Sequence, residues 1–333
     1  MRLHRSDLDA PGYTRRRSGR GFRYVRPDGR PLTEPGELRR CRDLVIPPAW
    51  QDVWICPDPA GHLQAIGTDA AGRRQYLYHP DWRERRDRKK FDHVLEVAQR
   101  LPRLRRRVTS DLTSGEWSRA RVLALAARLL DRGLFRVGGD QYANGEDPTF
   151  GVATLRASHT TVEAGRSTAV TFRYDAKGGI ERSVTVRDRT VAAAVRELKG
   201  HRRGRARLLA YQGEDGRWRP VRAADINEYL RAASGLDMSA KDLRTWRATV
   251  AAAVALARAD HPRSATAGKR TVASVMRAVA SELGNTPTVA RASYVDPRVI
   301  EHFLRGDTAA VPPSAPATGP AAEHAVADLL AGD

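Results

Sequence analysis

Short apolar runs separated by turn sequences dominate the chain between about residues 43 and 80. Residues 53–56, 63–66 and 75–78 are each long enough for one strand, and the intervening segments 57–61 and 69–72 are rich in Pro, Gly, Asp and Ala. Such spacing predicts a small antiparallel β domain. Residues 1–35 are rich in Arg, Gly and Pro and show little apolar periodicity, so we expect a basic arm there.

The apolar period changes to that of a helix after residue 80. Between residues 81 and 107, Phe91, Val94, Leu95 and Ala98 recur at helical spacing within a strongly basic stretch, which predicts the linker and first helix of a second domain. Residues 122–130 are almost continuously apolar and precede Gly133. This pattern predicts a buried helix that ends near the glycine.

A single β-hairpin is expected within the helical region. Apolar and polar residues alternate from 168 to 174, residues 175–179 contain two glycines, and a second strand-like run covers 180–186. Glycine supplies the dihedral angles that such a turn requires. Lys177 lies in the predicted turn.

Cap signals divide the C-terminal part into helices. Ser239 followed by Asp242 resembles a capping box, and Gly284 ends a helix over about 269–283. Thr286-Pro287 and Asp296-Pro297 each look like an N-cap followed by proline at the first helical position. Tyr294 therefore lies at the end of one short helix, immediately before the next.

We therefore predict an α+β fold with two domains. A small antiparallel β domain with its basic arm covers residues 1–82, and a larger, mainly helical domain with the β-hairpin covers residues 83–307. The Ala/Pro-rich residues 308–333 are expected to form a mobile tail with one or two terminal helical turns.

The net charge indicates an acidic partner. The 333 residues carry a formal charge of +19 from 58 basic and 39 acidic side chains, and nucleic acid is the first candidate, ahead of an anionic membrane.

The two cysteines provide neither a disulfide framework nor a zinc ligand set. We find no apolar run of membrane-spanning length and no secretory signal, so we expect a cytoplasmic protein.

Taken singly, the candidate residues have ordinary explanations. Arg136 would be a surface or ion-paired arginine, Lys177 a solvated loop residue, and Arg244 a side chain paired near a helix start. Asn285 would belong to a helix-terminating turn, and Tyr294 would be a half-buried packing residue.

Taken in order, the same residues resemble the type IB DNA topoisomerases, most closely the short poxvirus-like and bacterial form. The resemblance rests on an arginine, a hairpin lysine, Lys-x-Leu-Arg at 241–244, Gly-Asn-Thr-Pro at 284–287 and a tyrosine nine residues after the asparagine. It extends to the first domain through Ile-Pro-Pro-Ala-Trp at 46–50 and Gly-Arg-Arg-Gln-Tyr-Leu-Tyr at 72–78, and spans about residues 40–305.

The resemblance implies roles for individual residues. Tyr294 would attack a DNA phosphodiester and form a 3′-phosphotyrosyl bond, while Arg136 and Arg244 would hold the non-bridging oxygens. Lys177 would protonate the leaving 5′-oxygen, and Asn285 stands where viral and eukaryotic members have histidine. The implied DNA contacts are Gln75, Tyr76, Tyr78 and Tyr142. Gly139 replaces a lysine of the viral pattern, which leaves the base preference open.

Physical chemistry agrees with these roles. A phenol is a weak nucleophile, with a pKa of about 10, and needs cations and donors around the phosphate that it attacks. Guanidinium groups match two phosphate oxygens and need no metal. Asn285 can donate a hydrogen bond but cannot titrate. Exchanging one phosphodiester for another is nearly balanced in energy, and no Gly-x-x-x-x-Gly-Lys-Ser/Thr loop is found, so no cofactor or metal is expected.

The leading hypothesis is therefore a DNA topoisomerase that clamps duplex DNA in a C-shaped grip and relaxes supercoils without ATP. We expect a monomer associated with the nucleoid and with no membrane. A tyrosine recombinase would use related chemistry, but such enzymes usually carry His-x-x-Arg where this chain has Lys241 to Arg244. A passive DNA- or RNA-binding protein would explain the charge but not the late Arg, Asn and Tyr residues.

Overall fold

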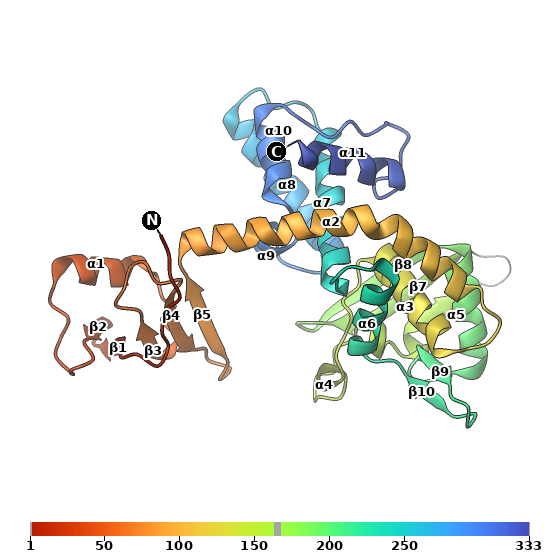
Figure 1. The fold of residues 1–333 in the computed structure, drawn as a ribbon, viewed down its shortest axis with the longest axis horizontal. Coiled ribbons are helices and arrows are strands. Elements are labelled where there is room, and N and C mark those ends of the chain that lie inside the picture. Colours follow the sequence, from red (N-terminus) through yellow and green to blue (C-terminus); the bar gives the residue numbers. More distant parts are fainter. Residues whose placement is uncertain (1, 163–167, 333) are drawn as a thin grey trace. The chain divides into compact units, whose positions relative to one another are not determined.

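A computed structural model describes residues 2–162 and 168–332 of the chain (Figure 1), and these residues form two compact units, 1–91 and 92–333. The division falls inside helix α2 (Pro80–Leu112), which begins in the first unit and continues into the second. A continuous helix therefore lies where the sequence suggested a linker followed by a helix. Among the residues described, no helix is both long and apolar enough to cross a membrane.

The first unit is built on a five-stranded antiparallel sheet with the strand order β2-β1-β3-β4-β5. Its strands are β1 (Tyr13–Ser18), β2 (Gly21–Val25), β3 (Gln51–Ile55), β4 (Leu63–Thr68) and β5 (Arg74–Tyr78). The last three match the predicted strand runs. Helix α1 (Pro35–Asp43) contributes Cys41 to a small core with Tyr24, Ile55 and Ala65.

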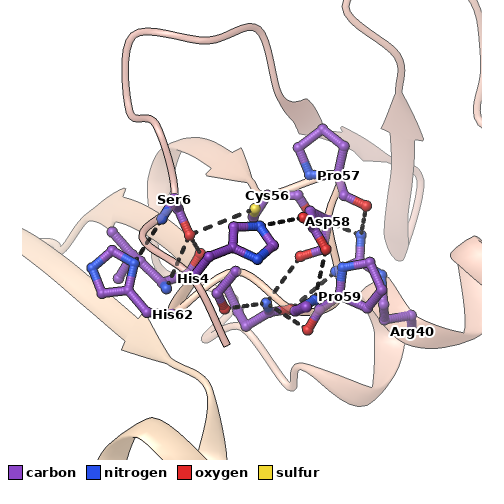
Figure 2. A network of polar contacts seen from close by, with 12 residues as sticks. His4, Ser6, Arg40, Cys56, Pro57, Asp58, Pro59 and His62 are labelled. Atoms are coloured by element: carbon purple, nitrogen blue, oxygen red, sulfur yellow. Dashed lines mark hydrogen bonds and ion pairs between the residues drawn. The ribbon is translucent and has the colours of Figure 1, made fainter. Parts of the chain in front are cut away.

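The basic arm expected over residues 1–35 is instead largely structured. Residues 13–25 form the β1–β2 hairpin, and the segment before it is bound to the sheet through polar contacts (Figure 2). Ser6 donates its hydroxyl to Leu63 O at 2.9 Å and its backbone N–H to His62 Nδ1 at 2.8 Å, while His4 pairs with Asp58. Three successive arginines, residues 15–17, interrupt the alternation of apolar and polar residues that marks a strand, and Arg15 is half-buried and donates to the carbonyl oxygens of Ile46 and Pro47.

The second unit is mainly helical and has one large core. Helix α3 (Arg119–Gly133) lies at its centre and is buried along almost its whole length, as predicted. It contacts α5 (Arg189–His201), α6 (Ala223–Ser234) and α7 (Ala240–Ala257), and α8 (Ala265–Leu283) packs against α7. The short elements α4 (Asp140–Ala143), η1 (Val152–Thr154), η2 (Ala157–His159), β9 (Ala210–Gln212) and β10 (Trp218–Pro220) complete the connections.

The predicted hairpin is part of a three-stranded antiparallel sheet in the second unit. Strands β7 (Ala169–Ala176) and β8 (Ile180–Arg187) are joined by residues 177–179, and β6 (Thr160–Val162) pairs with β7. Gly178 and Gly179 have φ angles of 88° and 69°, which a residue with a side chain rarely adopts. The two glycines therefore permit the tight turn that presents Lys177.

Residues 308–333 are not only a tail. Helix α11 (Pro320–Ala331) buries Ala322, Val326 and Leu330 in the main core. Its Glu323 accepts two hydrogen bonds from Arg105 of α2, at 2.7 and 2.8 Å. The apolar spacing of this short piece was visible in the sequence, but its partner surface on the core was not.

Candidate active site

Tyr294 lies at the junction of helices α9 (Pro287–Ser293) and α10 (Pro297–Arg305). Thr286 and Asp296 are the N-caps of these two helices, as the sequence predicted. From α7, the Thr249 hydroxyl donates to Tyr294 O at 3.3 Å and accepts from Asp296 N–H at 3.1 Å. This contact fixes the junction to the core, and only 9% of Tyr294 is exposed.

Arg244 reaches the tyrosine from the first turns of α7. Asp242 accepts hydrogen bonds from the backbone N–H and the hydroxyl of Ser239, each at 2.8 Å, and so stabilises the start of this helix. The Arg244 guanidinium is buried, donates to the carbonyl oxygens of Leu134 and Leu283, and lies 5.2 Å from the centre of the Tyr294 ring. It thus connects the end of α3, the end of α8 and the tyrosine.

Arg136 and Asn285 lie beside this pair and contact each other. Arg136 follows α3 in a segment that is neither helix nor strand. Its backbone carbonyl accepts a hydrogen bond from Val152 N–H at 2.9 Å. Its guanidinium donates to Asn285 Oδ1 and, at 3.4 Å, to Gly284 O. Gly284 ends α8 with a φ of 60°, and this left-handed conformation turns Asn285 toward Arg136.

The site contains cations whose hydrogen bonds go to neutral groups. Burial lowers the pKa of the Arg244 guanidinium to about 10; the charges of Arg136 and Arg182 act in the same direction, and Tyr294 opposes them. Arg244 therefore remains charged at neutral pH, yet its described hydrogen bonds go to two carbonyls and to Tyr294, not to carboxylates. Burying a cation without an acidic partner is costly.

Two buried donor atoms of these residues lack a hydrogen-bond partner among the described residues: Arg244 Nε and Asn285 Nδ2. Buried polar groups in folded proteins are nearly always satisfied. A group of unsatisfied donors beside two guanidinium groups is therefore a site that a phosphate-like anion would complete.

Arg182 and Tyr174 were not singled out from the sequence. They are directly opposite each other on β8 and β7, and Arg182 donates to Glu282 O at 2.7 Å. Burial raises the pKa of the Tyr174 phenol, while the charges of Arg182, Arg244 and Arg136 oppose that rise. Among 52 arginines, nothing in the local sequence marked Arg182, because its proximity to α8 arises from the tertiary fold.

Lys177 lies at the exposed tip of the β7–β8 hairpin. In the parts of the chain that the structure describes, no hydrogen bond connects it with Arg136, Arg244, Asn285 or Tyr294. The structure thus brings four of the five candidate catalytic residues together and leaves the fifth on a turn that projects into solvent.

Of the candidate DNA contacts, Tyr76 and Tyr142 are exposed, whereas Gln75 and Tyr78 are half-buried. Tyr76 and Tyr78 are on the edge strand β5, with their ring centres 6.4 Å apart in a stacked arrangement. Gln75 donates its amide to Asp69 at 2.8 Å. In the second unit, Tyr142 on α4 has 60% of its surface exposed. Exposed tyrosines are suited to contacts with sugars, phosphates and bases.

Comparison with known proteins places this arrangement in a family. Residues 79–303 match the model described as eukaryotic DNA topoisomerase I, catalytic core, and residues 21–69 match the model described as bacterial DNA topoisomerase IB, N-terminal domain. The DNA topoisomerase 1B of Acanthamoeba polyphaga mimivirus is 27% identical to this chain over 289 residues, which are 85% of each protein.

Proposed function

The chain belongs to the type IB DNA topoisomerase family, and from this premise we propose that it relaxes duplex DNA through a covalent phosphotyrosine intermediate formed by Tyr294. It is a type I DNA topoisomerase, so the proposal concerns the mechanism and the residues that carry it. The observation that supports it best is the convergence of Arg136, Arg244 and Asn285 on Tyr294, with unsatisfied donors among them.

In the proposed reaction the Tyr294 oxygen attacks the phosphorus of one strand. The new bond joins the phenolic oxygen to phosphorus, the bond from phosphorus to the 5′-oxygen breaks, and the phenolic proton passes to solvent water. Lys177 protonates the leaving 5′-oxygen. Resealing reverses each step after the free end has rotated, and because one phosphodiester replaces another, neither ATP nor a metal ion is required.

Arg136 and Arg244 would bind the two non-bridging oxygens of this phosphate. Each guanidinium carries a fixed positive charge and several N–H donors in one plane, which suits the negative charge that builds on those oxygens in the transition state. Asn285 would donate from Nδ2, which lacks a partner among the described residues, while its Oδ1 stays bonded to Arg136.

Lys177 would approach the phosphate when DNA is bound. Its turn is exposed and contains two glycines, so a groove of DNA can contact it without displacing any core side chain. Lysine can serve as a general acid once its ammonium group lies within hydrogen-bond reach of the leaving oxygen.

We further propose that the two units clamp the duplex as a monomer on nucleoid DNA. Gln75, Tyr76 and Tyr78 would contact DNA from the first unit, and Tyr142 would do so from the second. The net charge of +19 supports binding along the phosphate backbone. Because Gln75 donates to Asp69, its contact with DNA would use the free oxygen or follow release of that bond.

The decisive experiment traps the covalent adduct. Purified protein is incubated in EDTA and without ATP with a nicked suicide duplex, whose short 5′-hydroxyl strand dissociates after cleavage. We expect one DNA–peptide adduct at Tyr294 by mass spectrometry, none with Tyr294→Phe, and relaxation of both positive and negative supercoils by the wild type. Full activity of Tyr294→Phe would refute the proposed nucleophile.

A further inference from the structure

A large cavity lies in the second unit, next to the candidate active site. Its volume is about 1140 Å³, and its walls come from the end of α3, β8, α7 from Arg247 onward, the end of α8 and residues 317–318. Gly284 and Asn285 form part of its lining. The cavity therefore shares one wall with the site that we assign to the scissile phosphate.

The lining of this cavity is strongly positive. It includes the carboxylates of Glu181 and Glu282 against five guanidinium groups, which belong to Arg132, Arg182, Arg187, Arg247 and Arg258. A concave surface with an excess of one charge concentrates ions of opposite sign. An anion is thus the expected ligand.

Arg247 is the buried cation of this lining. It lies one turn after Arg244 on α7, and only 6% of it is exposed. Its described hydrogen bond is a long one, 3.5 Å from Nη2 to Arg132 O, and its Nε has no partner among the described residues. Burial lowers the pKa of its guanidinium, and the nearby charges of Asp131 and Glu323 oppose this.

The two nearby carboxylates are already occupied by another arginine. Arg105 donates to both oxygens of Asp131, at 2.9 and 2.8 Å, and to both oxygens of Glu323. Arg247 therefore gains their long-range attraction without direct hydrogen bonds. A buried guanidinium with an unused donor at the wall of a cavity needs a further acceptor.

Arg182 provides a second unused donor and connects the cavity to the catalytic residues. It lines the cavity, and its buried Nη1 lacks a partner among the residues described. Its charge also lowers the pKa of Arg244. An anion bound to Arg182 in the cavity would therefore also offset the repulsion between Arg182 and Arg244.

We propose that this cavity is a second anion-binding site that takes a phosphate-bearing ligand, with Arg247 and Arg182 as buried donors and Arg187 and Arg258 nearer to solvent. Guanidinium groups bind phosphate oxygens in pairs, and the cavity holds more than a single phosphate. The ligand is either a free polyphosphate or a phosphodiester of bound DNA, and the two sources share this chemistry.

Calorimetric titration with inorganic pyrophosphate at constant ionic strength tests the site. We expect one pyrophosphate site per chain in the wild type. Compared with the wild type, the affinity should be at least about tenfold weaker in Arg247→Gln and about threefold weaker in Arg187→Gln. Arg39→Gln, an exposed arginine of α1 in the other unit, should bind like the wild type. If Arg247→Gln does not fold, the exposed Arg187 still decides the question. Absence of saturable binding, or equal affinity in all variants, would overturn the proposal.

A second titration identifies the source of the phosphate. Tyr294→Phe protein is saturated with a short duplex and then titrated with pyrophosphate, so the measurement does not depend on strand cleavage. Loss of pyrophosphate binding, together with weaker duplex binding by Arg187→Gln, would assign the site to the DNA backbone. Simultaneous binding of both would assign it to a free polyphosphate.

Discussion

Arg105 and Arg244 are both substantially buried in the second unit, but their surroundings differ. Arg105 forms four hydrogen bonds with Asp131 and Glu323; burial opposes its charge, but these bonds raise the pKa of its guanidinium. Arg244 donates to two carbonyl oxygens and has one unpartnered nitrogen, and burial lowers its pKa. The first cation is paired within the fold, whereas the second has no acidic partner among the described residues.

This contrast suggests how a highly basic chain separates structural from functional arginines. A paired buried cation contributes to stability mainly because removing either partner leaves an uncompensated charge. A buried cation without an acidic partner costs stability and persists where function requires it. Removing Arg244 and removing Arg105, one arginine of each kind, tests this contrast.

The largest effect is expected at Arg244, the proposed catalytic cation. Arg244→Ala should lower the rate of single-turnover DNA cleavage by about 10³-fold, because the developing charge on the phosphate loses a preorganised donor. Its free energy of unfolding should change by no more than about 1 kcal/mol, because an unpaired buried cation is removed. Arg244→Lys keeps the positive charge but not the planar guanidinium, so its cleavage rate should lie between those of the wild type and Arg244→Ala. Wild-type cleavage by Arg244→Ala would contradict the assignment.

At Arg105, the paired arginine, we expect the opposite result: a loss of stability with little change in cleavage. Arg105→Met should lower the free energy of unfolding of the second unit by about 3 kcal/mol in chemical denaturation, because Asp131 is left buried and unpaired. Cleavage by the fraction that remains folded should be close to that of the wild type. A large loss of cleavage without loss of stability would place Arg105 in the catalytic machinery instead.

The same ion pair predicts a response to acid. Burial alone would raise the pKa of Asp131, but the hydrogen bonds and charge of Arg105 lower it below its usual value. The resulting stability is present above the unfolded pKa of about 3.9 and is lost as the pH falls through the lower folded value. Asp131→Asn should therefore be less stable at neutral pH and lose less stability between about pH 4 and 2.

A smaller effect is expected at Asn285. Asn285→His should retain cleavage within about tenfold of the wild type, because either side chain can donate to a phosphate oxygen, whereas Asn285→Ala should lose about 10²-fold. Quench-flow cleavage of the suicide duplex measures both. The proposed equivalence fails if the histidine variant is as impaired as Arg244→Ala.

The smallest effect concerns the first unit. Tyr76→Ala should weaken binding to a short duplex by about 1 kcal/mol, and Tyr76→Phe by less, because the ring provides most of the contact. Fluorescence anisotropy with a labelled duplex gives these affinities. Unchanged duplex affinity in Tyr76→Ala would exclude this tyrosine as a DNA contact. It would not bear on the roles proposed for the catalytic residues.

The sequence by itself determined the local elements, because their signals are local. Ser239 with Asp242, Gly284, Thr286-Pro287 and Asp296-Pro297 marked helix ends that the structure confirms. Two glycines marked the hairpin turn. The strands of residues 13–25 were missed because the consecutive arginines 15–17 leave little alternation of apolar and polar residues there.

The tertiary structure alone decided which arginines matter to one another. The Lys-x-Leu-Arg motif marked Arg244, but along the chain Arg105, Arg182 and Arg247 look alike, since each is a cation near apolar residues. Only packing brought carboxylates from α3 and α11 to Arg105, carbonyls from the ends of α3 and α8 to Arg244, and a cavity wall to Arg247. Burial and partner identity depend on contacts between distant segments, and these two quantities set the electrostatic role of each guanidinium.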